Sequence, residues 1–402
     1  MAPEGRDFRL IFAATVLNAV AGTVSGLALP LTAAVHLDAG PTQMGLLAAA
    51  ELLPFALFSL PAGPWIDRSR KQRLGVAFNL LAAAAALAIP VAFAIGFLSL
   101  GLLYTVGFVV GTCAVIGGSA TQVQLVRLAG RDALLAANAR LASFQSAIAL
   151  VGPAVAALLI DRVGAPFTLT VNALIFGAAA LAVGAIGHRE EAPAAVRAPW
   201  WREAKDGLRL IRGHPLLRAL AFFGALWLML LGGFNAQFVL FSTREAGLTA
   251  GQLALVTGCG AAGAFLASLA ARRFERNRGT RSVLLAGYLL SAVTMGLYPL
   301  AAAFGGAAMI MAAAVKLALD FGVTLYTVNY LALRQRITPE AMLGRVTTTM
   351  RGLAVSAAPV GALAWGLAAE GIGIGAAMLA ISACGIVLWF VAGRRLPAVP
   401  EA

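Results

Sequence analysis

Long apolar stretches, separated by short clusters of arginine, run along almost the whole sequence. Each stretch is long enough to cross a bilayer as a helix, because a hydrocarbon core of about 30 Å needs about 20 residues at a rise of about 1.5 Å each. The pattern predicts an all-α membrane protein with twelve transmembrane helices, at residues 10–34, 43–65, 75–96, 102–125, 141–161, 166–187, 217–241, 250–271, 282–303, 306–331, 352–370 and 372–393.

The composition excludes a water-soluble protein. Hydrophobic residues make up 60% of the 402 residues and charged residues only 12%, whereas a soluble domain is about 25% charged. The mean hydropathy is +0.87. The 44 glycines fit a tightly packed helical bundle, because small side chains let helices approach closely in lipid.

The net charge of +13 reflects membrane topology. Of the 30 lysines and arginines, only Arg162, Arg244 and Lys316 fall outside the loops on one side of the predicted membrane. Cytoplasmic loops collect positive charge, so we expect an even number of spans and both termini in the cytoplasm. Because the membrane accounts for the basic residues, we expect no nucleic-acid partner.

Enzymatic, metal and nucleotide chemistry have little support in the sequence. The three cysteines and three histidines are scattered, so we expect no disulfide, no metal site and no cofactor. The nucleotide-binding pattern GxxxxGK[ST] is absent, so ATP is not expected to be the direct energy source. The first apolar stretch is too long for a cleaved signal and is expected to stay as the first helix. We expect a monomeric, non-enzymatic protein.

An internal repeat divides the predicted spans into two sets of six. Pro359 lies 206 residues after Pro153, and the arginines Arg140 and Arg345 precede these prolines by 13 and 14 residues. Such paired bundles rock about a site at the midplane of the membrane. We therefore expect an N-terminal bundle, a cytoplasmic linker and a C-terminal bundle, at 1–187, 188–216 and 217–402.

The linker contains the segment PWWREAKDGLRLIRGHP. Apolar residues recur in it at helical spacing, with basic residues beside them: Trp201, Ala204, Leu208 and Ile211, next to Arg202, Lys205, Arg209 and Arg212. We interpret this as a surface helix whose arginines lie at anionic headgroups. A plain solvated tether is the alternative.

The stretch LLPFALFSLPAGPWIDRSRKQRL resembles the signature between the second and third helices of the major facilitator superfamily. It departs from the general form at Arg70, where the superfamily has a glycine. This variant, ALPL near 28–31, ELLP at 51–54 and RQRITPEAMLGRV at 334–346 are similar to the branch that holds the enterobactin exporter and macrolide efflux pumps. The positions that carry the signature are Gly63, Asp67, Arg68, Arg70, Lys71 and Arg73.

The resemblance implies a conformational latch. Asp67 would dock against the positive start of the helix near 345–352, where Arg345 lies, and hold the outward-facing state. Gly63 is expected to let its helix pass close to a neighbour. The alternative is an ordinary basic cytoplasmic loop.

A second motif, Gly152-Pro153, lies in the 141–161 span. Proline removes a backbone hydrogen bond and permits a bend. The pair resembles a superfamily element found in exporters that exchange substrate for protons, although Ala156 and Ala157 replace its later glycines. A tolerated kink between packed helices is the alternative.

Three ionisable residues lie inside predicted spans, where charge is costly and usually functional. Lys316 and Asp320 are four residues apart on one helical face, so they can pair. The pair is either structural, or one member binds substrate or a proton and releases the other. Glu51 has no partner nearby in the sequence. We interpret Glu51 and Asp320 as proton-coupling residues; a satisfied, hydrogen-bonded carboxylic acid is the alternative for Glu51.

Uncharged polar residues concentrate in the helices that line the cavity in the superfamily. Each is individually more often a packing contact than a ligand. Together with Lys316 they are the candidate substrate-binding residues: Asn18, Gln122, Gln145, Asn235, Gln237, Tyr326 and Asn329, with Gln124 beside them.

These features lead us to expect a secondary transporter of the bacterial inner membrane. A largely apolar cavity fits an amphipathic solute such as a drug or a siderophore, moved outward in exchange for protons by alternating access. An importer of a metal chelate or nutrient with the same fold is the first alternative, and a lipid flippase is the second.

Overall fold

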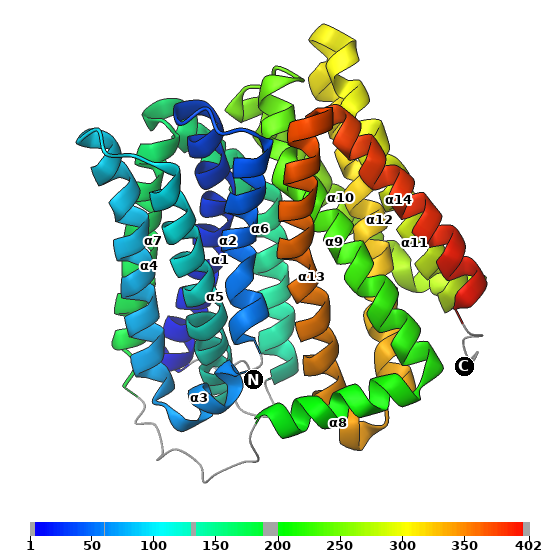
Figure 1. Ribbon diagram of the computed structural model, residues 1–402. Helices are drawn as coiled ribbons and strands as arrows, with labels where there is room; N and C mark the ends of the chain where they lie inside the picture. The colour runs from blue at the N-terminus through cyan, green and yellow to red at the C-terminus, as the bar shows by residue number, and fades with distance from the viewer. Residues whose placement is uncertain (1–4, 60, 130–133, 188–199, 397–402) are drawn as a thin grey trace. The chain divides into compact units, whose positions relative to one another are not determined.

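The computed structural model describes residues 5–59, 61–129, 134–187 and 200–396, and every regular element in these ranges is helical (Figure 1). Contacts divide the chain into two compact units. The first holds Met1–Ala39 and Ala50–Trp200, and the second holds Gly40–Ala49 and Trp201–Ala402. The predicted all-α fold class is confirmed.

The first unit contains the helices of the N-terminal half. A π-helical turn, Thr32–His36, extends the first helix of this unit. The second helix begins within the segment Gly40–Ala49, which groups with the other unit, and continues into the first unit. Its helices are α1 (Arg6–Leu31), α2 (Pro41–Phe58), α3 (Ala62–Arg68), α4 (Lys71–Ala94), α5 (Leu100–Ala129), α6 (Leu134–Val163) and α7 (Ala165–Gly184).

The second unit contains the helices of the C-terminal half. Two 3-10 segments, Tyr298–Ala307 and Glu340–Met342, separate some of them. Its helices are α8 (Trp200–Gly213), α9 (Pro215–Arg244), α10 (Ala250–Arg278), α11 (Thr280–Leu297), α12 (Ala308–Ile337), α13 (Leu343–Ile372) and α14 (Ile374–Arg395).

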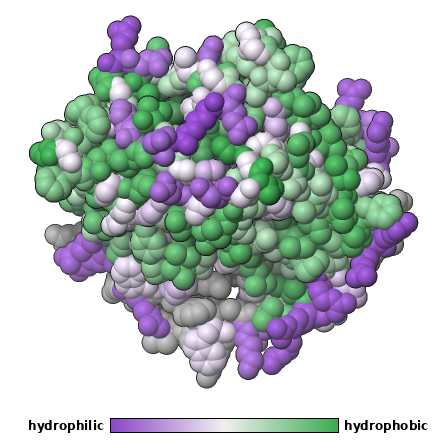
Figure 2. Space-filling model, turned by 45° about the horizontal axis from the view of Figure 1, so that its top comes forward, coloured by the Kyte–Doolittle hydropathy of each residue, from purple (hydrophilic) through white to green (hydrophobic). Residues whose placement is uncertain are grey.

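Eleven helical stretches in the described chain are long and apolar enough to cross a membrane. One of them, Thr280–Ile337, contains both α11 and α12, so these stretches hold the twelve predicted spans. Large apolar side chains are exposed on them; Leu181, for example, is 76% exposed. Apolar residues cover most of the surface in view, with hydrophilic residues in patches and along its edge (Figure 2). This is the surface that lipid requires.

Two spans end earlier than the apolar pattern predicts, and proline explains both. The expected 43–65 span stops at Phe58, shortly before Pro61, the residue that precedes α3. The expected 282–303 span leaves the α-helical form at Tyr298, where Pro299 follows and Gly305 takes a φ of 49°. Proline cannot continue the hydrogen-bond ladder.

The helices pair in the same order within each unit. In the first unit, α1 packs on α6 and α7, and α4 packs on α5 and α7. In the second, α9 packs on α13 and α14, and α11 packs on α12 and α14. These are equivalent helices in sequence order, so the two halves are pseudo-symmetric, as predicted.

The repeated proline motifs lie at equivalent helix contacts. Gly152 of α6 faces Thr23 of α1, and a Cβ atom on Gly152 would lie 2.9 Å from the Thr23 methyl group. In the second unit, Gly361 of α13 packs on the backbone of Met229 in α9. Small residues next to the prolines thus bring these helices close together.

The start of α2 packs within the second unit. The Thr42 amide donates to the Glu370 carboxylate at 3.2 Å, and a Cβ on Gly45 would lie 2.6 Å from the Ala362 carbonyl oxygen. The Gln237 side chain donates to the Pro41 carbonyl at 3.0 Å. Nothing in the apolar pattern indicated this grouping. The predicted domain limits at 187 and 217 stay a prediction, and residues 188–199 of the linker lie outside the described ranges.

Candidate functional site

The second unit contains a close ion pair inside a membrane span. Lys316 Nζ lies 2.7 Å from Asp320 Oδ1 and 2.6 Å from Oδ2. Both residues are on α12, about 12 and 18 Å along the helix from its first residue. The i, i+4 spacing sets this geometry, as the sequence predicts.

Two other helices, α10 and α9, contact the ion pair. Gly260 of α10 faces it so closely that a Cβ atom there would strike Asp320 Oδ2 and lie 3.0 Å from Lys316 Cγ. Lys316 Nζ also lies 5.3 Å from the centre of the Phe238 ring on α9, a cation–π distance. The Lys316 side chain is 11% exposed and that of Asp320 is 24%. The pair is therefore partly sheltered and still reachable by solvent or solute.

Aromatic residues extend from this pair. The Phe238 and Phe234 rings lie 5.3 and 5.6 Å from the Tyr298 ring. The Tyr298 hydroxyl is within hydrogen-bond distance, 2.8 Å, of the Ser242 hydroxyl. This side of the ion pair is apolar and closely packed, because Phe234 and Tyr298 are fully buried and Phe238 is 8% exposed.

Three of the predicted ligands in this unit are used in packing. Tyr326 is 4% exposed and its ring lies 4.6 Å from that of Trp227 and 5.5 Å from that of Tyr288. Asn329 donates to the Leu325 carbonyl one turn earlier. Gln237, fully buried, makes the bond to Pro41 given above. Burial favours a structural role for these residues, and their contact with substrate stays a prediction. Asn235 is exposed.

Glu51 is the acidic residue inside a span of the first unit, on a helix that is not the counterpart of α12. It lies on α2, half-buried, and its carbonyl oxygen would be 2.5 Å from a Cβ atom on Gly111 of α5. Gly111 thus lets α5 approach α2 beside Glu51. Among the described residues, no side chain or backbone group forms an ion pair or hydrogen bond with the Glu51 carboxylate.

Polar atoms without partners occur elsewhere in the first unit. The Asn18 Oδ1 atom and both amide atoms of Gln124 are buried without a hydrogen-bond partner in the described structure. Such groups normally bind water or a ligand. Gln122 and Gln145 are exposed. Gln124 therefore has a stronger chemical reason to bind a polar group than Gln122, its neighbour in the sequence.

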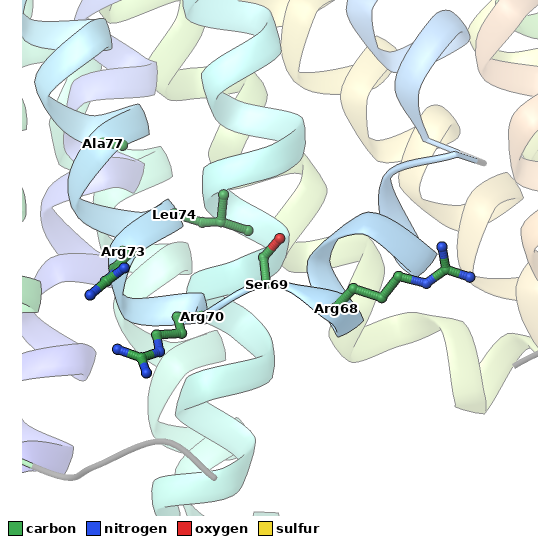
Figure 3. Close-up of a pocket in the computed structure, with 6 residues that line it drawn as sticks. All are labelled: Arg68, Ser69, Arg70, Arg73, Leu74 and Ala77. Carbon is green, nitrogen blue, oxygen red and sulfur yellow. The ribbon is translucent and has the colours of Figure 1, made fainter. Parts of the chain in front are cut away.

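The signature loop forms a basic groove at the junction of α3 and α4. The groove has a volume of about 570 Å³ and is lined by Arg68, Ser69, Arg70, Arg73, Leu74 and Ala77 (Figure 3). Lys71, in contrast, is buried. The Asp67 side chain lies outside the described part of the structure, so its docking stays a prediction.

One expectation about the latch is not met among the described residues, and one of its residues has a partner that the sequence did not indicate. Among the described residues, no neighbouring atom lies within 4 Å of a Cβ placed on Gly63. The expected close approach is therefore not observed there, because α2 ends before α3 begins and this glycine is exposed. Arg345 lies 3.1 Å from Asp206 of α8. There a Cβ atom on Gly207 would be 2.7 Å from the Arg345 carbonyl oxygen, so α8 sits tightly on the start of α13.

Gly260 is the residue of this site that the sequence did not reveal. Many glycines in the spans fit helix packing equally well, and nothing in their spacing shows which one faces a charge. The sequence did not single out Phe238 either; the structure buries it and places its ring beside Lys316. Both depend on which helices become neighbours.

Comparison with known proteins identifies the family. Residues 11–362 match the model of the Major Facilitator Superfamily. The chain is 26% identical to the multidrug efflux pump Tap of Mycobacterium tuberculosis over 416 residues, covering 99% of this chain and 95% of the pump. It is 28% identical to the uncharacterized MFS-type transporter y4rN of Sinorhizobium fredii, covering 88% of this chain and 86% of that protein.

Solved structures agree on the fold. A crystal structure of the nucleoside transporter NupG superposes with a TM-score of 0.78 at 12% identity, covering 98% of this chain and 99% of the other. A bacterial homologue of the iron transporter ferroportin, in an inward-facing state, gives a TM-score of 0.74 at 18% identity, covering 97% and 99%. Similarity at these identities concerns the fold alone. With the family match covering most of its length, the chain belongs to the major facilitator superfamily of multi-pass membrane transporters.

Proposed function

We propose that this transporter exports an amphipathic small molecule, such as a drug or a siderophore, across the bacterial inner membrane in exchange for protons. The observation that carries the proposal is an intramembrane carboxyl group, Glu51, without a partner among the described residues. An ionised carboxylate is costly at this depth. Proton binding removes that cost, and proton release restores it, so the group can couple a proton gradient to a conformational change.

The Lys316–Asp320 pair provides the second polar element of the proposed cycle. Its two carboxylate contacts, at 2.7 and 2.6 Å, hold the Lys316 ammonium while Asp320 is ionised. Protonation of Asp320 would weaken the attraction and free Lys316 for a polar group of the substrate. In this scheme Asp320 couples protons and Lys316 binds substrate.

An amphipathic substrate is supported by the side chains near the pair. The buried rings of Phe238, Phe234 and Tyr298 make the surroundings of one cation and one carboxylate apolar. A small anion would require several arginines. The similarity to a multidrug efflux pump favours export over import. We propose that uncharged polar residues complete the binding site: Asn18, Gln122, Gln145, Asn235, Gln237, Tyr326 and Asn329.

We further propose that Asp67 acts as a latch. Its carboxylate would meet the start of α13, where Met342 supplies no side-chain hydrogen bond to the first turn. A helix start attracts negative charge. Both termini would lie in the cytoplasm, because the basic loops follow the positive-inside pattern. The chain would act as a monomer.

Counterflow in proteoliposomes tests this function. The purified protein is reconstituted and loaded with unlabelled compound, and uptake of labelled siderophores and cationic drugs is measured with and without a pH gradient. We expect exchange of at least one amphipathic compound, accelerated by a gradient directed opposite to its movement. Exchange of nutrients or metal chelates alone, or transfer of labelled lipid between leaflets, would contradict the proposal.

Direction requires a cellular measurement. Expression in a pump-deficient bacterium should raise resistance to the compound that shows counterflow, and the Asp67→Asn variant, present in the membrane at the same level, should not. Increased sensitivity to that compound on expression would indicate import instead.

A further inference from the structure

Arg140 is an exposed arginine inside a membrane span of the first unit. The apolar pattern places it in the loop before the span expected at 141–161. In the structure α6 begins earlier, at Leu134, and Arg140 lies six residues, or about 9 Å, along the helix. Within the described ranges it takes part in no ion pair or hydrogen bond. A charge at this depth usually has a function.

The equivalent arginine of the second half is neutralised. In the internal repeat Arg345 corresponds to Arg140, and it lies 3.1 Å from the Asp206 carboxylate of α8. In the first unit, Asp7 is the acidic residue in the first turn of α1, and its carboxylate accepts from the Gly187 amide at 3.1 Å. Asp7 is therefore engaged beyond the end of α7. The guanidinium of Arg140 keeps its donors for another acceptor.

The Arg140 guanidinium lies on an aromatic cluster formed by α1 and α6. Its central carbon is 5.3 Å from the centre of the Phe12 ring on α1, a cation–π distance. The Phe144 ring, one turn after Arg140 on α6, meets the Phe12 ring edge-on with 5.3 Å between their centres. Phe12 is 9% exposed and Phe144 is 41% exposed. Phe12 thus supports the guanidinium, and Phe144 presents an accessible ring on the same helix face.

The chemistry of this cluster suits a carboxylate attached to a ring. A guanidinium binds a carboxylate through two parallel hydrogen bonds. Arg140 is in the second turn of α6, near the positive end of that helix, which also favours an anion. A ring attached to the carboxylate would pack on Phe144, because aromatic pairs are favourable at centre distances of about 4.5–7 Å. A small inorganic anion would leave the aromatic surface unused.

We propose that Arg140, Phe12 and Phe144 form a binding site for an aromatic carboxylate, with the carboxylate at the guanidinium and the ring against Phe144. The site lies at the end of the first unit where the basic loops gather, which is the cytoplasmic end in the proposed topology. As an entry site for export it rests on the proposed function. As a binding site it does not require transport, so a failure of counterflow and a failure of this site are distinguishable.

Isothermal titration calorimetry of the full-length protein in non-ionic detergent, with 2-naphthoate as the probe, tests the site. We expect saturable binding by the natural sequence. Arg140→Gln should weaken it by at least about tenfold, the usual contribution of a charge-assisted hydrogen bond. The neutral analogue 2-naphthylmethanol should bind both proteins equally weakly. No saturable binding of 2-naphthoate, or binding that Arg140→Gln leaves unchanged, would overturn the proposal.

The aromatic half of the site is tested separately. Phe144→Ala truncates an exposed side chain, so it opens no buried cavity. It should weaken 2-naphthoate binding about threefold to tenfold, as expected for the loss of one aromatic pair. Binding of octanoate, an aliphatic carboxylate, should weaken by a smaller factor. Equal factors for the two probes would contradict the recognition of a ring.

Arg394 provides a matched control in the second unit. It is also an exposed arginine next to a phenylalanine, with its guanidinium carbon 3.9 Å from the centre of the Phe390 ring. It lies in the last turn of α14, where the helix end is negative and disfavours an anion. Arg394→Gln should change 2-naphthoate binding less than about twofold. Equal weakening by Arg140→Gln and Arg394→Gln would overturn the proposal, since only the net charge would matter.

Two further measurements test other occupants of the site. Dihexanoyl phosphatidylglycerol should displace 2-naphthoate no better than dihexanoyl phosphatidylcholine, and stronger displacement by the anionic lipid would assign the site to a headgroup instead. Asp132, eight residues before Arg140, lies outside the described ranges. Asp132→Asn should change 2-naphthoate binding less than about twofold. A large gain in binding would show that Asp132 occupies the guanidinium and would contradict a site open to a ligand.

Discussion

The two halves, with six spans each, pair their helices in the same order but carry their intramembrane charges differently. In the first unit, Glu51 has a carboxylate without a partner among the described residues. In the second, Lys316 and Asp320 neutralise each other against Gly260 and Phe238. A common packing scheme therefore does not fix where charge lies. Glu51 is suited to exchange protons, whereas the Lys316–Asp320 pair is expected to act mainly on the free energy of unfolding.

Breaking the ion pair from one side has the largest expected effect on the free energy of unfolding. Asp320→Asn leaves the Lys316 ammonium without a counter-charge in a site where its side chain is 11% exposed. Removing one partner of a buried pair costs about 3–5 kcal/mol. We expect the lower end, about 3 kcal/mol, because Asp320 retains some exposure. Chemical unfolding of the purified protein in detergent measures it.

The control for this prediction removes both charges together. Lys316→Met/Asp320→Leu replaces the pair by apolar side chains of similar volume and should recover most of the lost stability, since such replacements are often neutral. If the double variant is as unstable as Asp320→Asn, the pair does more than neutralise charge. Transport by the double variant should be lost, because both proposed functional groups are gone.

Filling the space at Gly260 has the next largest effect. Gly260→Ala places a methyl group against Asp320 Oδ2, and overpacking of this kind costs about 1–3 kcal/mol. In an Asp320→Ala background the same change should cost less, because the carboxylate no longer obstructs it and only Lys316 Cγ, at 3.0 Å, stays close. Gly344→Ala is the matched control, since nothing lies within 4 Å of a Cβ atom there. An equal cost in both backgrounds would mean that Gly260 packs against something else.

The ion pair between α8 and α13 should matter much less than the one inside α12. Arg345 and Asp206 are 43% and 38% exposed, and pairs of this kind contribute about 0.2–1 kcal/mol. A double-mutant cycle with Asp206→Asn and Arg345→Gln measures the coupling. A coupling above about 2 kcal/mol would contradict the distinction between the surface pair and the intramembrane pair.

The smallest expected effect on stability is at Glu51. Glu51→Gln breaks no ion pair or hydrogen bond in the described structure, so the free energy of unfolding should change by less than about 0.5 kcal/mol, as for ordinary positions outside such contacts. The measurement is the same unfolding experiment. Destabilisation comparable to that of Asp320→Asn would show that Glu51 is a structural residue and would remove the contrast between the units.

Local spacing predicted the parts of this molecule that depend on one helix at a time. The number of spans follows from apolar length, and the Lys316–Asp320 contact follows from the i, i+4 geometry of a single helix. The apolar pattern ran past Pro61 and Pro299, so it placed two helix ends too late. The two prolines in the sequence were the signal for the observed ends. The residues of the signature loop were sufficient to identify the family.

Contacts between helices were beyond the sequence. Gly260 faces a charge, Gln237 bonds to Pro41, and residues 40–49 group with the second unit. Each depends on which helices become neighbours and at which register. Alanine and glycine are so frequent in the spans that many registers satisfy the same pattern, so single-helix periodicity does not select among them.

The measurement that tests the proposed proton coupling most directly is proton release on substrate binding. The compound identified by counterflow is added to the purified protein in weakly buffered detergent solution with a pH indicator, for the natural sequence and for Glu51→Gln. We predict proton release by the natural protein, little or none by Glu51→Gln, and retained binding of the compound by both. Equal proton release by the two proteins would contradict the role of Glu51.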